Sequence, residues 1–226
     1  MKKFRKWIFS LKWVDKNLLF FLSFFLITGG AYAAGLPEPK VEFSADSYVQ
    51  TGNYTSESKI YRSMDKERRE LDLGDSKQVV ISRMDKNVIW MLMPAQNLYM
   101  EMSLSDQKTK QGAGEFSYEE ITQTVVGEEM IEGMKSIKSK ISVKDFSGTT
   151  FQGYMWTTKD GITLKMDTVT VGKGQPFQIK MHLKNVKIGK QDPNIFEIPS
   201  GYTKMDMGFP FGGHGLGMEG MENGSR

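Results

Sequence analysis

Residues 88–102 read VIWMLMPAQNLYMEM, and this stretch is the strongest structural signal in the chain. Six apolar residues run without a break from Val88 to Met93, and Pro94 ends the run because it has no backbone N–H to donate to a sheet. A second apolar run begins at Leu98. The pattern therefore predicts a β-hairpin whose short turn includes Pro94 and Asn97.

The first strand of this hairpin is apolar on both faces. An antiparallel strand with one solvated face alternates apolar and polar residues, so we expect this strand to be covered on both sides. The strand alone leaves two environments open: a plain hydrophobic core, or a core on one side and a dry ligand cavity on the other. The alternating residues form two sets, Val88, Trp90 and Leu92 on one face and Ile89, Met91 and Met93 on the other.

The first 33 residues have the composition of an export signal. Residues 1–16 are basic, residues 18–27 read LLFFLSFFLI, and Ala31-Tyr32-Ala33 is a small-residue cleavage site. The apolar run has ten residues, whereas a membrane-spanning helix needs about 20. We expect residues 1–33 to be a signal peptide cleaved after Ala33, and the product to be periplasmic with no stable transmembrane anchor. An uncleaved anchor is the alternative.

Charge and cysteine content narrow the possible functions. The net charge of the whole chain is +3, and residues 1–33 carry six basic and one acidic side chain, so −2 is left once their +5 is removed. A domain without a basic excess has no nucleic-acid signature. The chain has no cysteine, which excludes disulfides, a cysteine nucleophile and a lipid anchor on cysteine.

Residues 34–205 are predicted to form one mainly β domain. Short segments with apolar–polar alternation or β-branched residues recur along it, and turn signals such as Lys159-Asp160-Gly161 separate them. This spacing indicates a single curved antiparallel sheet. The predicted strands cover residues 41–45, 59–62, 68–73, 78–83, 88–93, 98–102, 137–143, 150–157, 162–166 and 177–183.

Two segments depart from the strand pattern. A short helix is predicted at 116–126, because Ser117 could cap it and two glutamates, Glu119 and Glu120, would occupy its first turn. The Gly- and Met-rich residues 206–226 have too few bulky apolar side chains to order themselves, so a disordered tail is expected.

Four segments together resemble the LolA-like superfamily of periplasmic lipoprotein carriers, and within it an uncharacterised exported branch. They are an opening strand (VEFSADSYV, 41–49), the hairpin at 88–102, a Gly-Glu strand (GEEMIEGMKSIKSKISV, 127–143) and a closing segment with an Asp-Pro turn (DPNIFEIPSGYTKM, 192–205). The resemblance implies a half-open barrel with an apolar concave face and one or two short helices as a lid. Such a face would hold a lipid or a lipoprotein acyl chain without enzymatic chemistry.

The resemblance also raises the question of a cavity arginine, which in the carriers hydrogen-bonds the lid. This sequence does not single out its counterpart. Arg62, Arg68, Arg69 and Arg83 are candidates by their position in or near predicted strands. Adjacent arginines such as Arg68 and Arg69 are more typical of a solvated edge strand, where charges discourage pairing with another chain.

The predicted ligand wall follows from the resemblance, which places the concave surface at mid-strand positions and at the inserted turn. Methionines near these positions would either adapt to an irregular apolar ligand or fill an ordinary core. In the alternative function, the same sheet has a filled core, holds no ligand and docks another envelope protein. The expected ligand-binding residues are Trp90, Leu92, Tyr99, Trp156, Ile179, Met181 and Phe196.

No catalytic site, metal site or cofactor is predicted. The chain has two histidines, His182 in a strand and His214 in the tail, and no Ser/His/Asp spacing accompanies them. Methionines around His214 offer thioether and imidazole ligands that suit Cu(I), but a flexible tail of biased composition is the simpler interpretation.

Overall fold

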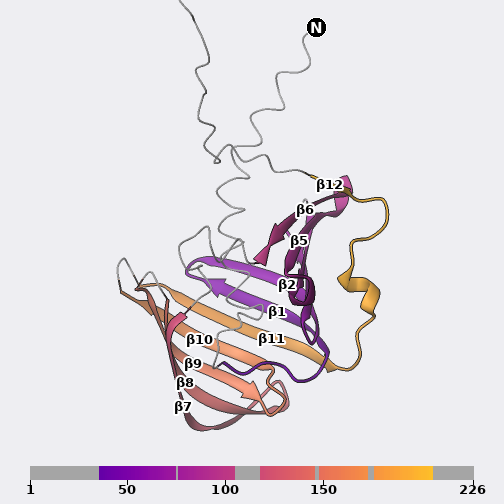
Figure 1. Cartoon of the computed structure of the whole chain (residues 1–226). Coiled ribbons are helices and arrows are strands. Elements are labelled where there is room, and N and C mark those ends of the chain that lie inside the picture. The colour runs from indigo at the N-terminus through magenta and orange to yellow at the C-terminus, as the bar shows by residue number, and fades with distance from the viewer. Residues whose placement is uncertain (1–35, 75, 105–117, 146–147, 173–175, 206–226) are drawn as a thin grey trace, which may run out of the picture.

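The computed structural model describes residues 36–74, 76–104, 118–145, 148–172 and 176–205. Its twelve strands form one sheet in the order β12-β6-β5-β4-β3-β2-β1-β11-β10-β9-β8-β7 (Figure 1). The strands are β1 (Phe43–Thr51), β2 (Tyr54–Ser63), β3 (Lys66–Asp72), β4 (Lys77–Arg83), β5 (Val88–Met93), β6 (Leu98–Ser103), β7 (Tyr118–Ile131), β8 (Met134–Asp145), β9 (Thr150–Thr158), β10 (Thr163–Val171), β11 (Gln178–Ile188) and β12 (Thr203–Lys204).

Neighbouring strands are antiparallel throughout, except that β12 runs parallel to β6. The predicted mainly β class, with one curved antiparallel sheet, is therefore confirmed. No helix in the described ranges is long and apolar enough to cross a bilayer. The predicted signal peptide at 1–33 and the predicted tail at 206–226 lie outside the described residues.

The hairpin predicted at 88–102 is confirmed as β5 and β6, joined by the 3-10 turn η2 (Pro94–Gln96). Asn97 ends that turn with a φ of 52°, in the left-handed region that asparagine tolerates better than most residues. The preceding connection uses the same device, since η1 (Met84–Lys86) ends at Asn87 with a φ of 56°. Both faces of β5 are buried, as predicted, through Ile89 and Met91 on one side and Trp90 and Leu92 on the other.

The helix predicted at 116–126 is wrong, because the chain from Tyr118 onward is strand β7. Ser117 and two glutamates favoured a helix start, but β-branched side chains lose rotamer freedom in a helix and pack well on a sheet. β8 pairs with β7 along most of its length. The β-branched residues that decide the outcome are Ile121, Thr122, Thr124, Val125 and Val126.

The described part of the chain contains three complete 3-10 turns, η1, η2 and η3 (Pro193–Phe196), and Leu104, at the end of a described range, is also helical. η1 and η2 connect neighbouring strands, and η3 lies between β11 and β12. No complete helix that could serve as the implied lid lies within the described residues.

The strand register sorts buried side chains onto two faces of the sheet. Pairing from β11 through β1 to β5 places Met181, Val49, Leu71, Val80 and Met91 on one face. We call this face the inner face. Side chains of β3 and β9 line one pocket on it, although four strands lie between β3 and β9 in the sheet, so the sheet curls toward this side. The opposite, outer face is covered beside β3–β6 by residues 190–205, drawn in yellow-orange in Figure 1.

Gly153 in β9 explains part of the curvature. A Cβ atom at this position would lie 2.0 Å from the carbonyl oxygen of Asp167 in β10, so only glycine lets the two strands approach this closely. A bulge between Thr163 and Lys165 bends the same pair of strands further. The sheet can then curl around the side chains of its inner face.

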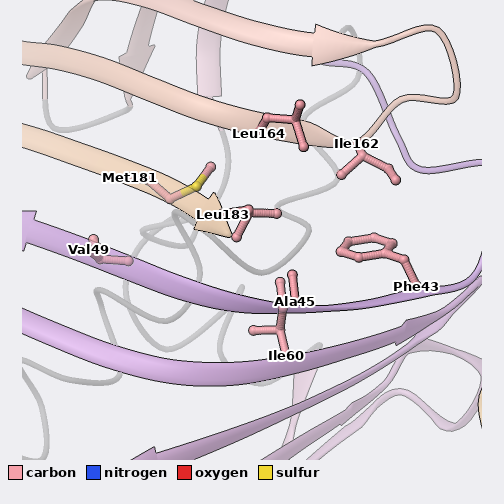
Figure 2. Close-up of a cluster of buried hydrophobic side chains, with 8 residues drawn as sticks. All are labelled: Phe43, Ala45, Val49, Ile60, Ile162, Leu164, Met181 and Leu183. Atoms are coloured by element: carbon pink, nitrogen blue, oxygen red, sulfur yellow. The ribbon is translucent and has the colours of Figure 1, made fainter. Parts of the chain in front are cut away.

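Three apolar clusters stabilise the sheet. Figure 2 shows the first, on and around β1, β2, β10 and β11: Phe43, Ala45, Val49, Ile60, Ile162, Leu164, Met181 and Leu183. The second lies on the inner face of β3–β6: Leu71, Val80, Ile89, Met91 and Met100. The third lies on the outer face, beneath the C-terminal segment: Val79, Ile81, Trp90, Leu92 and Phe196.

Candidate ligand-binding site

Three charged side chains lie on the inner face between its two apolar clusters. Arg62 of β2 donates from Nη1 to Glu67 Oε2 at 2.9 Å, and Arg69 of β3 donates from Nη2 to Glu67 Oε1 at 3.1 Å. Each of the three residues is at most 5% exposed. Burying a charge costs several kcal/mol unless it is paired, so Glu67 stabilises both guanidinium groups. We call these residues the charged trio.

A pocket of about 120 Å³ opens beside the charged trio. Ser47, which is 1% exposed, also lines the pocket, and its buried hydroxyl has no hydrogen-bond partner among the described residues. A buried hydroxyl in that situation costs about 1–3 kcal/mol. The remaining walls are mostly apolar and include Phe43, Ile60, Met155, Met166, Met181 and Leu183.

One side of the pocket is closed by residues 36–39, which we call the strap. The backbone N–H of Lys40, the next residue, donates to the carbonyl of Asp160 at 2.8 Å. Gly161 lies directly against the strap, because a Cβ atom there would be 1.9 Å from the carbonyl oxygen of Glu38. Its φ of 83° also favours glycine. The strap therefore rests on the turn between β9 and β10.

Methionines line both apolar parts of the inner face. Met155, Met166 and Met181 are cross-strand neighbours in the pocket wall. On the other side of the charged trio, Met91 and Met100 face each other across β5 and β6, with Met93 and Met102 packed against the same cluster. Unbranched thioether side chains repack around irregular apolar shapes. The inner face can therefore adjust to an apolar ligand.

The site offers apolar burial and fixed charge. Within the described ranges, no group of three or more His, Asp or Glu side chains is arranged to hold a metal ion. Its guanidinium groups can bind an anionic group through charge-assisted hydrogen bonds.

The family model described as a domain of unknown function, DUF4412, matches residues 47–168, just over half of the chain. The chain belongs to the DUF4412 family. No curated protein matches it.

Solved structures are similar to this DUF4412 domain at low sequence identity. An uncharacterized conserved protein from Thermus thermophilus is 9% identical, with a TM-score of 0.50 over 74% of this chain and 90% of that one. The lipoprotein LppX from Mycobacterium tuberculosis is 11% identical, with a TM-score of 0.39 over 72% and 91%. The MucA/MucB complex of Pseudomonas aeruginosa is 14% identical, with a TM-score of 0.45 over 70% of this chain and 56% of the matched chain. This chain therefore spans little more than half of the length of that one. The Thermus thermophilus structure shows a likeness of fold to this chain.

The residues predicted to bind a ligand fall on both faces of the DUF4412 sheet. Ile179 and Met181 are on the inner face, and Met181 lines the pocket. Trp156 is on the outer face of β9. It pairs with Lys165 of β10, which pairs in turn with His182 of β11, and His182 points away from the face of its neighbour Met181. The structure brings the other four together on the outer face, in or against the third apolar cluster: Trp90, Leu92, Tyr99 and Phe196.

The C-terminal segment, residues 190–205, is held on the outer face by two of the four candidate arginines. Arg68 Nη1 donates to the carbonyl of Ile195 at 2.9 Å, and Arg83 Nη1 donates to the carbonyl of Phe196 at 3.3 Å. Sequence order alone could not show this, because each arginine is more than 100 residues from its acceptor. Arg68 and Arg83 therefore position the C-terminal segment, while Arg62 and Arg69 belong to the pocket.

The expected solvated edge at Arg68-Arg69 is wrong. β3, which carries both residues, lies between β2 and β4 in the interior of the sheet. Each guanidinium group finds acceptors on its own face, Glu67 on the inner side and Glu70 and the C-terminal segment on the outer side. Paired in this way, both arginines are accommodated in an interior strand.

Arg83 is also the centre of an ion-pair network that includes Asp85, Glu197 and Lys86. The hydrogen bond to Asp85 raises the pKa of Arg83 above its ordinary value, and Glu197 adds to this effect. Burial alone would raise the pKa of Glu197, but hydrogen bonds from Lys86 and Arg83 hold it below its usual range. The ionised form of Glu197 therefore favours docking of the C-terminal segment.

Trp156 is surrounded by charged side chains. Its Nε1 donates to Glu129 Oε2 at 2.7 Å, and the ammonium groups of Lys165 and Lys138 lie 4.4 and 5.0 Å from its ring centroid. Hydrogen bonds from Lys138 and then Trp156 lower the pKa of Glu129. Trp156 is buried, as is Trp90.

Sequence reasoning did not identify Ser47, Glu67 or the strap as parts of a site. A usable signal was present at residues 67–69, because positions two apart in a strand share a face. Glu67 and Arg69 were therefore bound to lie on one side and Arg68 on the other. Ser47 interrupts an alternating apolar face, but one serine in such a pattern does not by itself indicate a binding site.

Proposed function

We propose that this DUF4412 domain is a non-enzymatic binding protein that holds a hydrophobic ligand, such as a lipid or an acyl chain, on its inner face. The observation that carries the proposal is the pocket, which is concave, mostly apolar and bordered by methionines and buried charges. Ligand sites in proteins commonly combine apolar walls with a few placed polar groups. Burial would supply about 25 cal/mol per Å² of apolar area.

A pair of variants on β10 tests this proposal. Met166 is half-buried in the pocket wall, whereas Val169 is 40% exposed on the outer face of the same strand. Met166→Asp should abolish uptake of N-phenyl-1-naphthylamine, a neutral fluorescent probe, because a desolvated carboxylate opposes apolar binding. Val169→Asp adds the same charge and should leave uptake unchanged. Thermal melts would confirm that both variants fold.

The ligand itself can be sought by mass spectrometry of lipid extracted from the purified protein. Wild-type protein that carries no lipid and takes up no probe would refute the proposal. The same result would favour the second candidate function, an envelope protein-interaction module with a filled inner face. One observation supports that candidate, because about 120 Å³ is below the roughly 300–1,000 Å³ usual for ligand pockets.

The proposal includes export to the periplasm, with residues 1–33 as a signal peptide cleaved after Ala33 and residues 206–226 as a disordered tail. Intact-mass measurement of the secreted protein should give a chain that starts at Ala34. A product in the membrane fraction that retains Met1 would instead place the domain on a tether.

A further inference from the structure

We propose that the pocket selects an amphiphile with a single carboxylate, such as a long-chain carboxylic acid. The carboxylate would be bound by the Ser47 hydroxyl and by the guanidinium groups of Arg62 and Arg69. This inference rests on the proposed function and names the ligand class of the same site.

Ser47 provides the first reason. The other β1 residues on its face are Phe43, Ala45, Val49 and Thr51, and the two nearest to Ser47, Ala45 and Val49, are apolar, so an apolar residue would be expected at position 47 of a plain core. Ser47 lines the pocket, and its hydroxyl is shielded from solvent and lacks a hydrogen-bond partner among the residues that the structure describes. Buried hydroxyls are nearly always hydrogen-bonded. A ligand oxygen in the pocket would accept the hydrogen bond that Ser47 can donate.

The charges of the trio provide the second reason. Arg62 and Arg69 carry two positive charges and Glu67 one negative charge, so the three side chains sum to +1. Both arginines also take part in other interactions, and each guanidinium group has five N–H donors to distribute. A carboxylate would add a charged acceptor for these donors, and such a partner stabilises a buried guanidinium group. Its two oxygens also match the donor geometry of arginine.

The pocket walls decide where the remainder of the ligand would lie. The polar groups and the apolar side chains of Met155, Met166 and Met181 line the same cavity. A carboxylate at the trio therefore places the first methylenes of its chain against these methionines. A neutral head group would gain the same apolar contacts but would make only neutral hydrogen bonds to the guanidinium groups, which are weaker than those of a carboxylate.

The test compares dodecanoate with dodecan-1-ol, which have the same number of carbons and different head groups. Each would displace N-phenyl-1-naphthylamine from wild-type protein at about pH 8, where the acid is ionised. Dodecanoate should bind at least about tenfold more tightly, as expected for hydrogen bonds to a charged group. Equal affinities, or tighter binding of the alcohol, would overturn the inference and leave the proposed function intact. A protein that takes up no probe would refute both.

Two matched variants locate the head group. Ser47→Ala should reduce the preference for dodecanoate several-fold without loss of stability, because it removes a hydroxyl that lacks a partner in the described structure. Ser82→Ala is the control, since Ser82 also has a buried hydroxyl with no described partner but does not line the pocket. Arg69→Met should abolish the preference while the alcohol still binds. An unchanged preference in both Ser47→Ala and a folded Arg69→Met would place the carboxylate elsewhere and overturn the assignment.

Discussion

Replacing Phe196 with alanine should destabilise the domain without changing its ligand preference. The Phe196 side chain is 0% exposed and packs against Val79, Ile81, Trp90 and Leu92. Truncating a buried phenylalanine to alanine costs about 3–5 kcal/mol, and the cost is highest where the surroundings cannot close the cavity. Arg68 and Arg83 hold the carbonyls of residues 195 and 196 in place. We therefore expect a loss near the upper end of that range.

Urea unfolding followed by tryptophan fluorescence measures this loss directly, because Trp90 belongs to the affected cluster. The melting temperature should fall by about 10–20 °C, taking a loss of about 5 kcal/mol and about 2–4 °C per kcal/mol for a domain of this size. Phe177→Ala is the matched control, since Phe177 is exposed and its truncation should cost less than about 0.5 kcal/mol. A loss below about 1 kcal/mol at Phe196, or a changed preference between dodecanoate and dodecan-1-ol, would refute the assignment of this cluster to the structural core.

Three further outcomes test other parts of the structure. The pKa of Glu197 is lowered in the folded state from an ordinary value of 4.5, so its contribution to stability is complete above that pH and is lost as the pH falls through the lowered value. Glu197→Gln should therefore reduce the loss of unfolding free energy at acid pH, measured by urea unfolding from pH 3 to 7. The same dependence on pH in wild type and variant would contradict the ion-pair network. Gly161→Ala should displace the strap and speed probe uptake, because its Cβ would collide with the Glu38 carbonyl. If the strap stays protected from proteolysis and the probe enters at the wild-type rate, the strap does not control access to the pocket. Gly153→Ala should lower the melting temperature by several degrees, because its Cβ would collide with the Asp167 carbonyl, and a melt identical to wild type would show that the close approach of β9 and β10 is dispensable.

The hairpin could be predicted because its evidence is local. A proline, an asparagine and two apolar runs determine β5 and β6 whatever the rest of the chain does. The helix at 116–126 failed for a related reason, because its capping signal was local while pairing with β8 decided the outcome. Local signals predict structure well only when tertiary pairing agrees with them.

The candidate site was harder to predict, because alternation within one strand does not relate that strand to the next. Trp90 and Met181 could each be given a side, but only the register through the intervening strands shows that the sides are opposite. The C-terminal segment adds a further long-range contact, since it covers the face that carries Trp90 and Leu92. Four predicted ligand residues consequently lie together in a core cluster rather than in the pocket.

The methionine lining gives the inner face a specific chemical sensitivity. Oxidation turns a flexible apolar thioether into a polar sulfoxide, which would make the wall unsuitable for an apolar chain until a reductase restores it. Met91, Met100, Met155 and Met181 are buried, so peroxide can reach them only when the face opens. The rate of sulfoxide formation at these positions would therefore report how often the closed face opens to solvent, and a bound amphiphile would slow it.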